Sequence, residues 1–259
     1  MQDMTLQATL IHRQLFCYRF HRAKCQIIIH QDIKHSRFGP LKEFLEIVPI
    51  KCPHQYFSQG SRASQAPMIF SKKQMIVRAK HNYANKLCRF VLQSVKNRYN
   101  RHEALQKFMI YNDSVTVATE VPVYITKDDL EHLKTQLGFE IYSKENWKLP
   151  ELITGHVDFL QIRNGQIHIL DYKPKAEKIR PIEQLTLYAM ALSRLTGLRL
   201  FEFKCAWFDE TDYFEFFPLH VLYKPKRKRI RKKITTKEGT YILNEEMKKI
   251  TSLKPLIKK

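Results

Sequence analysis

The sequence lacks any apolar segment long enough to cross a membrane. No run approaches the ~18 consecutive apolar residues that suggest a spanning helix. The N-terminus includes Asp3 and has no apolar stretch of the kind found in secretory signal peptides. We therefore expect an intracellular, cytoplasmic protein that makes no membrane contact.

Cysteines are too few and too irregularly spaced for a disulfide framework. The chain has five, an odd number, at positions 17, 25, 52, 88 and 205. Small secreted domains that depend on disulfides usually carry an even set of cysteines. The cysteine content therefore favours a reducing compartment.

Acidic residues are scarce relative to basic ones. The chain has 25 Asp and Glu against 45 Lys and Arg, a formal net charge of +20, which favours a polyanionic partner such as nucleic acid. Residues 224–233 contain eight basic residues and no acid. Because such a segment repels itself, we expect a solvated arm on phosphates, the alternative being a tail with no role in binding. It lacks the apolar face that a membrane surface would require.

Length and composition fit one folded core with two flanking segments. The 259 residues, of which 44% are hydrophobic, suffice for a core of roughly 150 residues with appended parts. We divide the chain into a basic, aromatic N-terminal extension at 1–70, a core at 71–222 and a basic C-terminal tail at 223–259.

The stretch from residue 155 to residue 173 predicts an antiparallel hairpin. Apolar residues mark two short strands on either side of Asn164-Gly165, a dipeptide typical of tight turns. Asp158 lies in the first strand and Asp171 in the second. The two carboxylates can therefore approach each other across the strands.

The second strand ends in a pattern that indicates a metal site. Side chains alternate along a strand, so Asp171 and Lys173 share one face while Tyr172 points to the other. Two adjacent carboxylates need a cation, and oxygen ligands suit Mg²⁺ or Mn²⁺, which polarise a phosphoryl oxygen and lower the pKa of bound water. A neighbouring ammonium can offset the charge that develops during phosphodiester cleavage. The alternative is an exposed ion pair with Asp158 flanking a turn, but the apolar strand around Leu170 favours a site.

A helix is predicted directly after this strand. Apolar residues recur at helical spacing between Pro181 and Gly197, which gives a helix over 181–196. Gln184 and Tyr188 lie four residues apart and share one face that can look back at the strand ends. The alternative is a surface glutamine and a core tyrosine.

These motifs resemble the PD-(D/E)XK nuclease superfamily, and within it the RecB-like exonucleases. The resemblance rests on Gly155-His-Val-Asp158, Ile169-Leu-Asp171-Tyr-Lys173 and Gln184-Leu-Thr-Leu-Tyr188, and covers about residues 72–222. It implies an α/β, restriction-endonuclease-like core in the order α-β-β-β-α-β, with a mixed central sheet flanked by helices. It also implies that Asp158 and Asp171 are metal ligands together with the carbonyl of Tyr172, that Lys173 is the catalytic lysine, and that Gln184 and Tyr188 support the active site.

Two upstream residues resemble further ligands of the family. Residues 116–125 predict a strand in which Glu120 is similar to the acidic residue that precedes the G-x-x-D strand; the alternative is a carboxylate on the strand surface. Residues 71–98 predict a long helix, and His81 on it resembles the histidine ligand that many relatives supply. A helical histidine is more often a surface residue, which is the alternative for His81.

The resemblance implies a metal-dependent deoxyribonuclease that uses Mg²⁺ or Mn²⁺ and acts on DNA ends or single strands. A helicase or another DNA-processing partner is compatible with it. Some relatives hold an iron-sulfur cluster with three cysteines after the core, but here only Cys205 follows the lysine motif, so we expect no cluster. The competing hypotheses are a nuclease-fold DNA-binding protein without cleavage, disfavoured by the intact Asp158, Asp171 and Lys173, and an enzyme that acts on RNA.

The N-terminal seventy residues carry the weakest pattern. Cys17, His21, Cys25 and His30 form C-x3-H-x3-C-x4-H, a set able to bind Zn²⁺, but its spacing matches no common zinc finger. Basic and aromatic residues between Arg13 and Arg22 could stack on bases. We favour a small helical cover over the core.

Deletion of residues 224–259 should weaken DNA binding at low salt and flatten its salt dependence, because each lost phosphate contact lowers the slope of log affinity against log salt by about 0.9 on duplex DNA. Cleavage at saturating substrate should persist, since the proposed site lies at 155–188. Binding isotherms at several salt concentrations measure the slope. An unaltered slope would make the tail a targeting or partner-binding segment.

Overall fold

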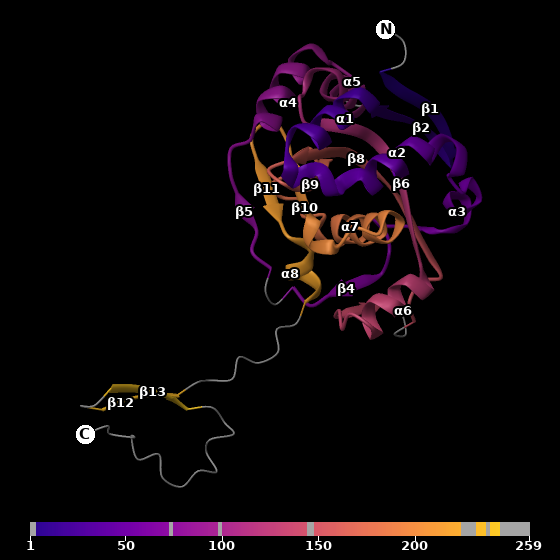
Figure 1. Ribbon diagram of the computed structural model, residues 1–259. Helices are drawn as coiled ribbons and strands as arrows, with labels where there is room; N and C mark the ends of the chain where they lie inside the picture. Colours follow the sequence, from indigo (N-terminus) through magenta and orange to yellow (C-terminus); the bar gives the residue numbers. More distant parts are fainter. Residues whose placement is uncertain are drawn as a thin grey trace. The chain divides into compact units, whose positions relative to one another are not determined.

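The computed structural model describes residues 4–72, 75–97, 100–143, 148–223, 232–236 and 239–243 (Figure 1). The chain divides into two compact units, Met1–Lys224 and Pro225–Lys259. The first unit contains the predicted core together with the N-terminal segment. No helix in the described ranges is both long and apolar enough to cross a bilayer.

A mixed sheet of nine described strands forms the centre of the first unit, which confirms the predicted α/β class. Eight of the strands follow one path. In their order across the sheet they are β1 (Thr5–His12), β2 (Gln14–His21), β6 (Thr116–Thr126), β8 (Leu152–Arg163), β9 (Gln166–Tyr172), β10 (Phe203–Phe208), β11 (Tyr213–Phe216) and β5 (Arg78–Ala79). The ninth, β3 (Ser61–Arg62), pairs with β8 in parallel. Strands β9 and β10 also run parallel, whereas the other neighbours are antiparallel.

The predicted hairpin is strands β8 and β9. Asn164 and Gly165 have φ values of 53° and 71°, as the tight turn between these strands requires. The pairing runs from Arg163 opposite Gln166 to Phe159 opposite Leu170. Alternation then assigns Leu170 and Tyr172 to one face of the sheet and Asp171 to the other.

Helices cover both faces of the sheet (Figure 1). Helix α7 (Ile182–Thr196) packs on the face that carries Ile169, Cys205 and Trp207. It ends at Gly197 with φ 71°, as the sequence predicts. Helices α4 (Tyr83–Ser94) and α5 (Arg101–Asn112) pack on the face of Leu170.

The single helix predicted over 71–98 is wrong. Residues 78–79 form strand β5, which pairs with β11, and α4 begins only after Asn82. The Asn82 side chain accepts a hydrogen bond from the Ala84 amide, and the Asn85 side chain binds the Asn82 amide. This capping box fixes the helix start. The second helix, α5, has no counterpart in the sequence prediction.

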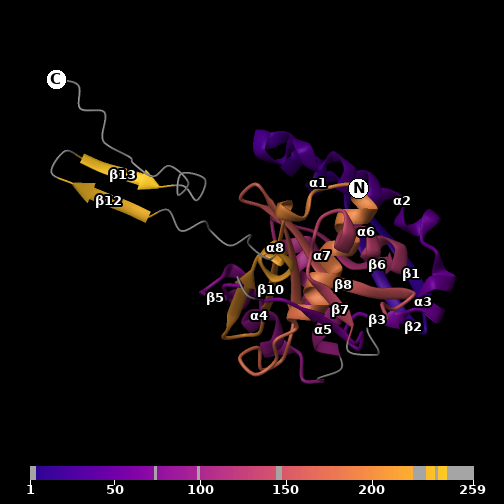
Figure 2. The same ribbon diagram turned by 90° about the horizontal axis from the view of Figure 1, so that it is seen from below.

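The N-terminal segment is more than the helical cover that the sequence favours. Strands β1 and β2 form a hairpin that pairs with β6 through Arg19–Thr119 and Phe20–Ala118. The helices of this segment are α1 (Arg22–Gln31), a 3-10 turn (Ile33–Phe38), α2 (Gly39–Lys51) and α3 (His54–Gln59). Figure 2 shows α1 and α2 beside β1 and β6. Tyr18 and Phe20 are fully buried and therefore belong to the core instead of stacking on bases.

The remaining elements lie at the periphery. The insertion after β6 contains α6 (Lys127–Thr135) and β7 (Ile141–Ser143), which pairs with β4 (Met68–Phe70). Helix α8 (Pro218–Leu222) follows β11, and a 3-10 turn (Leu200–Glu202) precedes β10. In the second unit, β12 (Lys232–Thr236) and β13 (Gly239–Leu243) form a hairpin that the sequence does not predict. Most of the basic run at 224–233 lies outside the described residues.

The Lys24 side chain links α1 to the end of α5 and the start of β6. Its ammonium donates to the carbonyls of Ile110, Asp113 and Thr116, at 2.6, 2.7 and 3.1 Å. These carbonyls end α5 and begin β6. One side chain therefore joins three elements.

Replacing Lys24 by Met should lower the free energy of unfolding by about 1–3 kcal/mol, because it removes a charged donor from part-buried carbonyls. Lys34→Met, at an exposed lysine, is the matched control. Chemical denaturation measures both. Equal stability of the two variants would contradict this role of Lys24.

Candidate active site

The site lies where strand β8 loses its neighbour on one edge. Pairing with β9 ends at Phe159, and pairing with β3 involves only Ile153 and Thr154. Within the described residues, Gly155 to Asp158 therefore have a strand partner only on the β6 side. This gap contains the complete Gly-His-Val-Asp segment.

Asp158 occupies the gap at the point where β8 and β9 part. Its Oδ2 accepts a hydrogen bond from the backbone amide of Tyr172 at 3.0 Å. The same oxygen lies 2.7 Å from Nε2 of His102. The Asp158 carboxylate thus accepts the hydrogen bond of the Tyr172 amide, which has no backbone partner on β8. This contact holds the carboxylate in place.

Asp171 and Lys173 lie together, as expected for alternate residues of one strand. Lys173 Nζ is 2.9 Å from Asp171 Oδ2, and the aspartate side chain is almost fully buried. The contact is an ion pair between neighbouring residues on one face of the strand. Among the described residues, neither buried oxygen of Asp171 has a hydrogen-bond partner. Lys173 offsets the charge of this carboxylate from one side only, so a buried acid with no hydrogen bond leaves room for a further cation.

Glu120 faces this pair from β6. The flanking pairs Thr119–Phe159 and Val121–Val157 place it opposite Asp158. Its φ is 51°, an uncommon conformation for a residue within a strand. Backbone outliers of this kind concentrate at functional sites. Gln106 donates to Glu120 Oε1 at 2.6 Å and so holds the carboxylate.

Helix α5 supplies two side chains that the sequence analysis missed. His102 and Gln106 lie four residues apart on one helical face and contact Asp158 and Glu120. His81 instead lies exposed in the segment before α4, and the structure does not bring it to the carboxylates. The helical spacing of Leu105 and Met109 after Asn100 is the signal that could have revealed α5.

Gln184 and Tyr188, which the sequence predicts to share one face of a helix, lie on α7, and Tyr188 contacts β8 at Gly155. Gln184 Nε2 donates to the Tyr188 hydroxyl at 2.9 Å, and Tyr188 is buried. A Cβ placed on Gly155 would lie 2.3 Å from Cε1 of the Tyr188 ring. The glycine is therefore required because the tyrosine packs directly on the backbone of β8.

The carboxylates differ in their tendency to hold a proton. Burial opposes the charge of Asp158, yet the adjacent His102 holds its pKa at about 2. Burial, followed by the charge of Asp158, raises the pKa of Glu120 to about 7 and that of Asp171 well above its ordinary value. Burial likewise opposes protonation of His102, but Asp158 raises the pKa of His102 to about 9. Two of the three acids thus resist ionisation in the absence of a further positive charge.

The donor set fits a hard divalent cation. One ligand atom from each of His102, Glu120 and Asp158 lies within 4.8 Å of the others. Asp171 is not part of this group of three, and its role as a ligand remains a prediction. Carboxylate oxygens suit Mg²⁺, and an added imidazole suits Mn²⁺ as well. The Tyr172 ring packs on the opposite face, and its carbonyl remains a predicted ligand.

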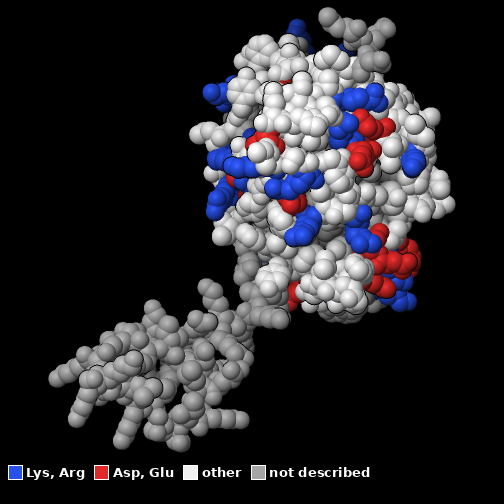
Figure 3. All heavy atoms as spheres, viewed as in Figure 1, with Lys and Arg blue, Asp and Glu red and all other residues white. Residues whose placement is uncertain are grey.

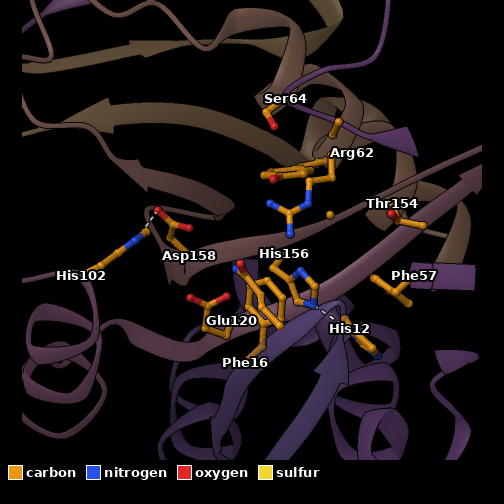
Figure 4. Close-up of a pocket in the computed structure, with 14 residues that line it drawn as sticks. His12, Phe16, Phe57, Arg62, Ser64, His102, Glu120, Thr154, His156 and Asp158 are labelled. Atoms are coloured by element: carbon orange, nitrogen blue, oxygen red, sulfur yellow. Dashed lines mark hydrogen bonds and ion pairs between the residues drawn. The ribbon is translucent and has the colours of Figure 1, made fainter. Parts of the chain in front are cut away.

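A pocket of about 210 Å³ opens onto these residues (Figure 4). Asp158, Glu120 and His102 line one part of it, and residues of the N-terminal segment line another. The Arg62 side chain projects into the pocket between Ser64 and His156. Among the described residues, no hydrogen bond or ion pair engages its guanidinium. The pocket therefore combines carboxylates with an available arginine.

The sequence was also compared with known families. The profile of the PD-(D/E)XK nuclease superfamily matches residues 61–250, well over half of the chain. The chain belongs to this superfamily. Comparison with curated proteins finds no match. Members of the PD-(D/E)XK superfamily are nucleases, so a phosphodiester of nucleic acid is the expected substrate.

Replacing Gly155 by Ala should lower the free energy of unfolding by about 1–3 kcal/mol, because the new methyl group must displace a packed ring. In a Tyr188→Ala background the same replacement should cost less, since the ring is gone. Denaturant unfolding of the four proteins in this cycle measures the coupling. An equal cost in both backgrounds would show that Tyr188 does not restrict residue 155.

Proposed function

We propose that the protein is a Mg²⁺- or Mn²⁺-dependent deoxyribonuclease. The observation that carries this proposal is the pair of buried carboxylates, Asp158 and Asp171, beside Lys173 and the half-buried Glu120. Among the described residues, Asp171 has one ion pair, with Lys173, and no hydrogen bond, so this buried carboxylate keeps capacity to bind a further cation. Superfamily membership supports the same reaction class.

Each side chain then has a distinct role. Asp158 and Asp171, with Glu120 and the Tyr172 carbonyl, would hold the cation, which polarises the scissile phosphodiester and lowers the pKa of an attacking water when bound. Lys173 places a positive charge beside Asp171, where it can offset charge that develops on the phosphate. Burial opposes the charge of Lys173, but Asp171 raises its pKa, so the ammonium stays protonated.

The histidine and glutamine of α5 orient the acids. His102 fixes one oxygen of Asp158, and Gln106 fixes one oxygen of Glu120. If metal binding displaces its proton, His102 can instead offer a nitrogen to the cation, in place of the predicted His81. Gln184 and Tyr188 support the backbone of β8 from the other side of the sheet.

The pocket walls fit a nucleic acid strand. Arg62 lines the pocket and is available for a phosphate. Residues 224–259 contain fourteen basic and three acidic residues, a net +11, so residues 1–223 retain +9 of the total +20. Basic side chains are spread over the face of the first unit seen in Figure 3. We propose action on DNA ends or single strands, in the manner of the RecB-like enzymes that the motifs resemble.

Asp171→Ala and Lys173→Ala should each reduce cleavage at least about 100-fold, because each removes charge stabilisation at the reacting phosphate. Lys178→Ala, at an exposed lysine near the site, is the control and should cleave normally. Cleavage of linear, circular and single-stranded DNA is measured with Mg²⁺, Mn²⁺ or EDTA. DNA binding by the two site variants should remain close to that of the wild type.

The outcomes separate the competing hypotheses. Cleavage of linear but not circular DNA would establish a requirement for ends, and the same assay on RNA tests the alternative substrate. Wild-type rates in either site variant would overturn the assignment of residues. DNA binding without cleavage under every metal condition would favour a nuclease fold that only binds DNA.

A further inference from the structure

A second group of metal-binding side chains lies beside the pocket. It consists of His12, Cys52 and His54, whose ligand atoms all lie within 4.8 Å of one another. His12 Nε2 is 2.9 Å from Nδ1 of His54 and 3.8 Å from Sγ of Cys52. None of these residues belongs to the carboxylate site.

Local structure brings the three side chains to one point. His12 is the last residue of β1 and is buried. Cys52 caps the C-terminus of α2, and His54 is the first residue of α3. Cys52 donates its amide to Val48, and His54 donates its amide to the carbonyl of Cys52. These bonds hold both residues at a fixed turn that faces the end of β1.

The spacing resembles that of a tetrahedral zinc site. Bond lengths of about 2.0–2.1 Å to nitrogen and about 2.3 Å to sulfur give ligand separations of about 3.4 Å between nitrogens and about 3.6 Å between nitrogen and sulfur. The separations from His12 to His54 and Cys52 lie within about 0.5 Å of these values. A thiol with two imidazoles also suits Zn²⁺ better than the hard ions of the carboxylate site.

The second nitrogen of His12 has the partner that a metal-bound histidine usually has. His12 Nδ1 lies 2.8 Å from Nε2 of His156, and the Phe57 ring stacks on His12 at 3.9 Å. Such a bond fixes which ring nitrogen is free to bind the metal. Here it leaves Nε2 directed at Cys52 and His54.

A chain of hydrogen-bonded imidazoles is the simpler explanation for part of this group. It accounts for the contacts of His12 with His54 and His156. It does not account for Cys52, whose sulfur approaches the same Nε2 that His54 already engages. The convergence of three potential ligand atoms is what a cation explains.

We propose that His12, Cys52 and His54 bind a Zn²⁺ ion that fastens the turn between α2 and α3 to strand β1. The Cys52 thiol loses its proton to solvent on binding, and a water molecule completes the coordination. His54 is exposed, so the ion can enter from solvent. Because His12, Phe57 and His156 all line the pocket, the ion stabilises a wall of the site.

The test uses the full-length protein, stripped of metal and titrated with Co²⁺ and Zn²⁺. In a background of Asp158→Ala, which removes a carboxylate of the nuclease site, Zn²⁺ should bind at one equivalent, and Co²⁺ should give the near-ultraviolet charge-transfer band of a thiolate ligand. Cys52→Ser should abolish this band, and His54→Ala should weaken binding beyond the about 10- to 100-fold loss that is typical of an outer-sphere partner. Cys17→Ser and His30→Ala, in the same segment but outside the group, should leave binding unchanged.

Three further measurements separate the zinc result from misfolding and from the nuclease proposal. Circular dichroism verifies that each variant is folded, and the gain in thermal stability that Zn²⁺ gives the wild-type protein should be lost in Cys52→Ser, whereas any gain with Mg²⁺ should be the same in both proteins. Asp171→Ala should retain the zinc site even though it loses cleavage. Failure of the Asp158→Ala protein to bind Zn²⁺ at one equivalent, or a Co²⁺ band that persists in Cys52→Ser, would overturn the proposal and leave the nuclease assignment intact.

Discussion

The parting of strands β8 and β9 beyond the Phe159–Leu170 pair is the constraint on which the site depends. Backbone groups inside a sheet need partners, and the gap removes those that a continuous ladder would supply. Asp158 compensates by accepting the Tyr172 amide, and Tyr188 of α7 packs on the backbone of β8 at Gly155. Residues that stabilise the gap are therefore also residues of the proposed site. The Asp158 carboxylate binds a backbone amide, and Gly155 leaves room for the Tyr188 ring.

The same gap also brings acidic and basic side chains together. Three carboxylates converge from β6, β8 and β9, and the nearby cations His102 and Lys173 each bind one of them. Glu120 has a neutral amide as its hydrogen-bond partner. The fold therefore brings three acids together, and burial keeps Glu120 and Asp171 from ionising readily unless further positive charge is present.

The sequence predicted those features of the fold that depend on residues close together in the chain. The hairpin follows from Asn164-Gly165, the extent of α7 from Pro181 and Gly197, and the shared face of Asp171 and Lys173 from the period of a strand. The helix at 71–98 failed because a strand pairing with β11 and the cap at Asn82 override the apolar spacing. His102, Gln106 and Arg62 depend on contacts between distant segments, which no local pattern encodes. The site roles of Asp158, Asp171 and Lys173 remain predictions, although the structure places these side chains together.

The hairpin β1–β2 has a consequence for where this protein can be divided. The superfamily match begins at residue 61, yet β2 covers the edge of β6 that faces away from β8. A fragment starting at the match would present bare hydrogen-bonding groups of β6 to solvent, next to apolar surface formerly under Tyr18 and Phe20. Open edges of this kind recruit strands from other molecules. The first sixty residues therefore also act as protection against aggregation, and the boundary of the family is not a boundary of the folding unit.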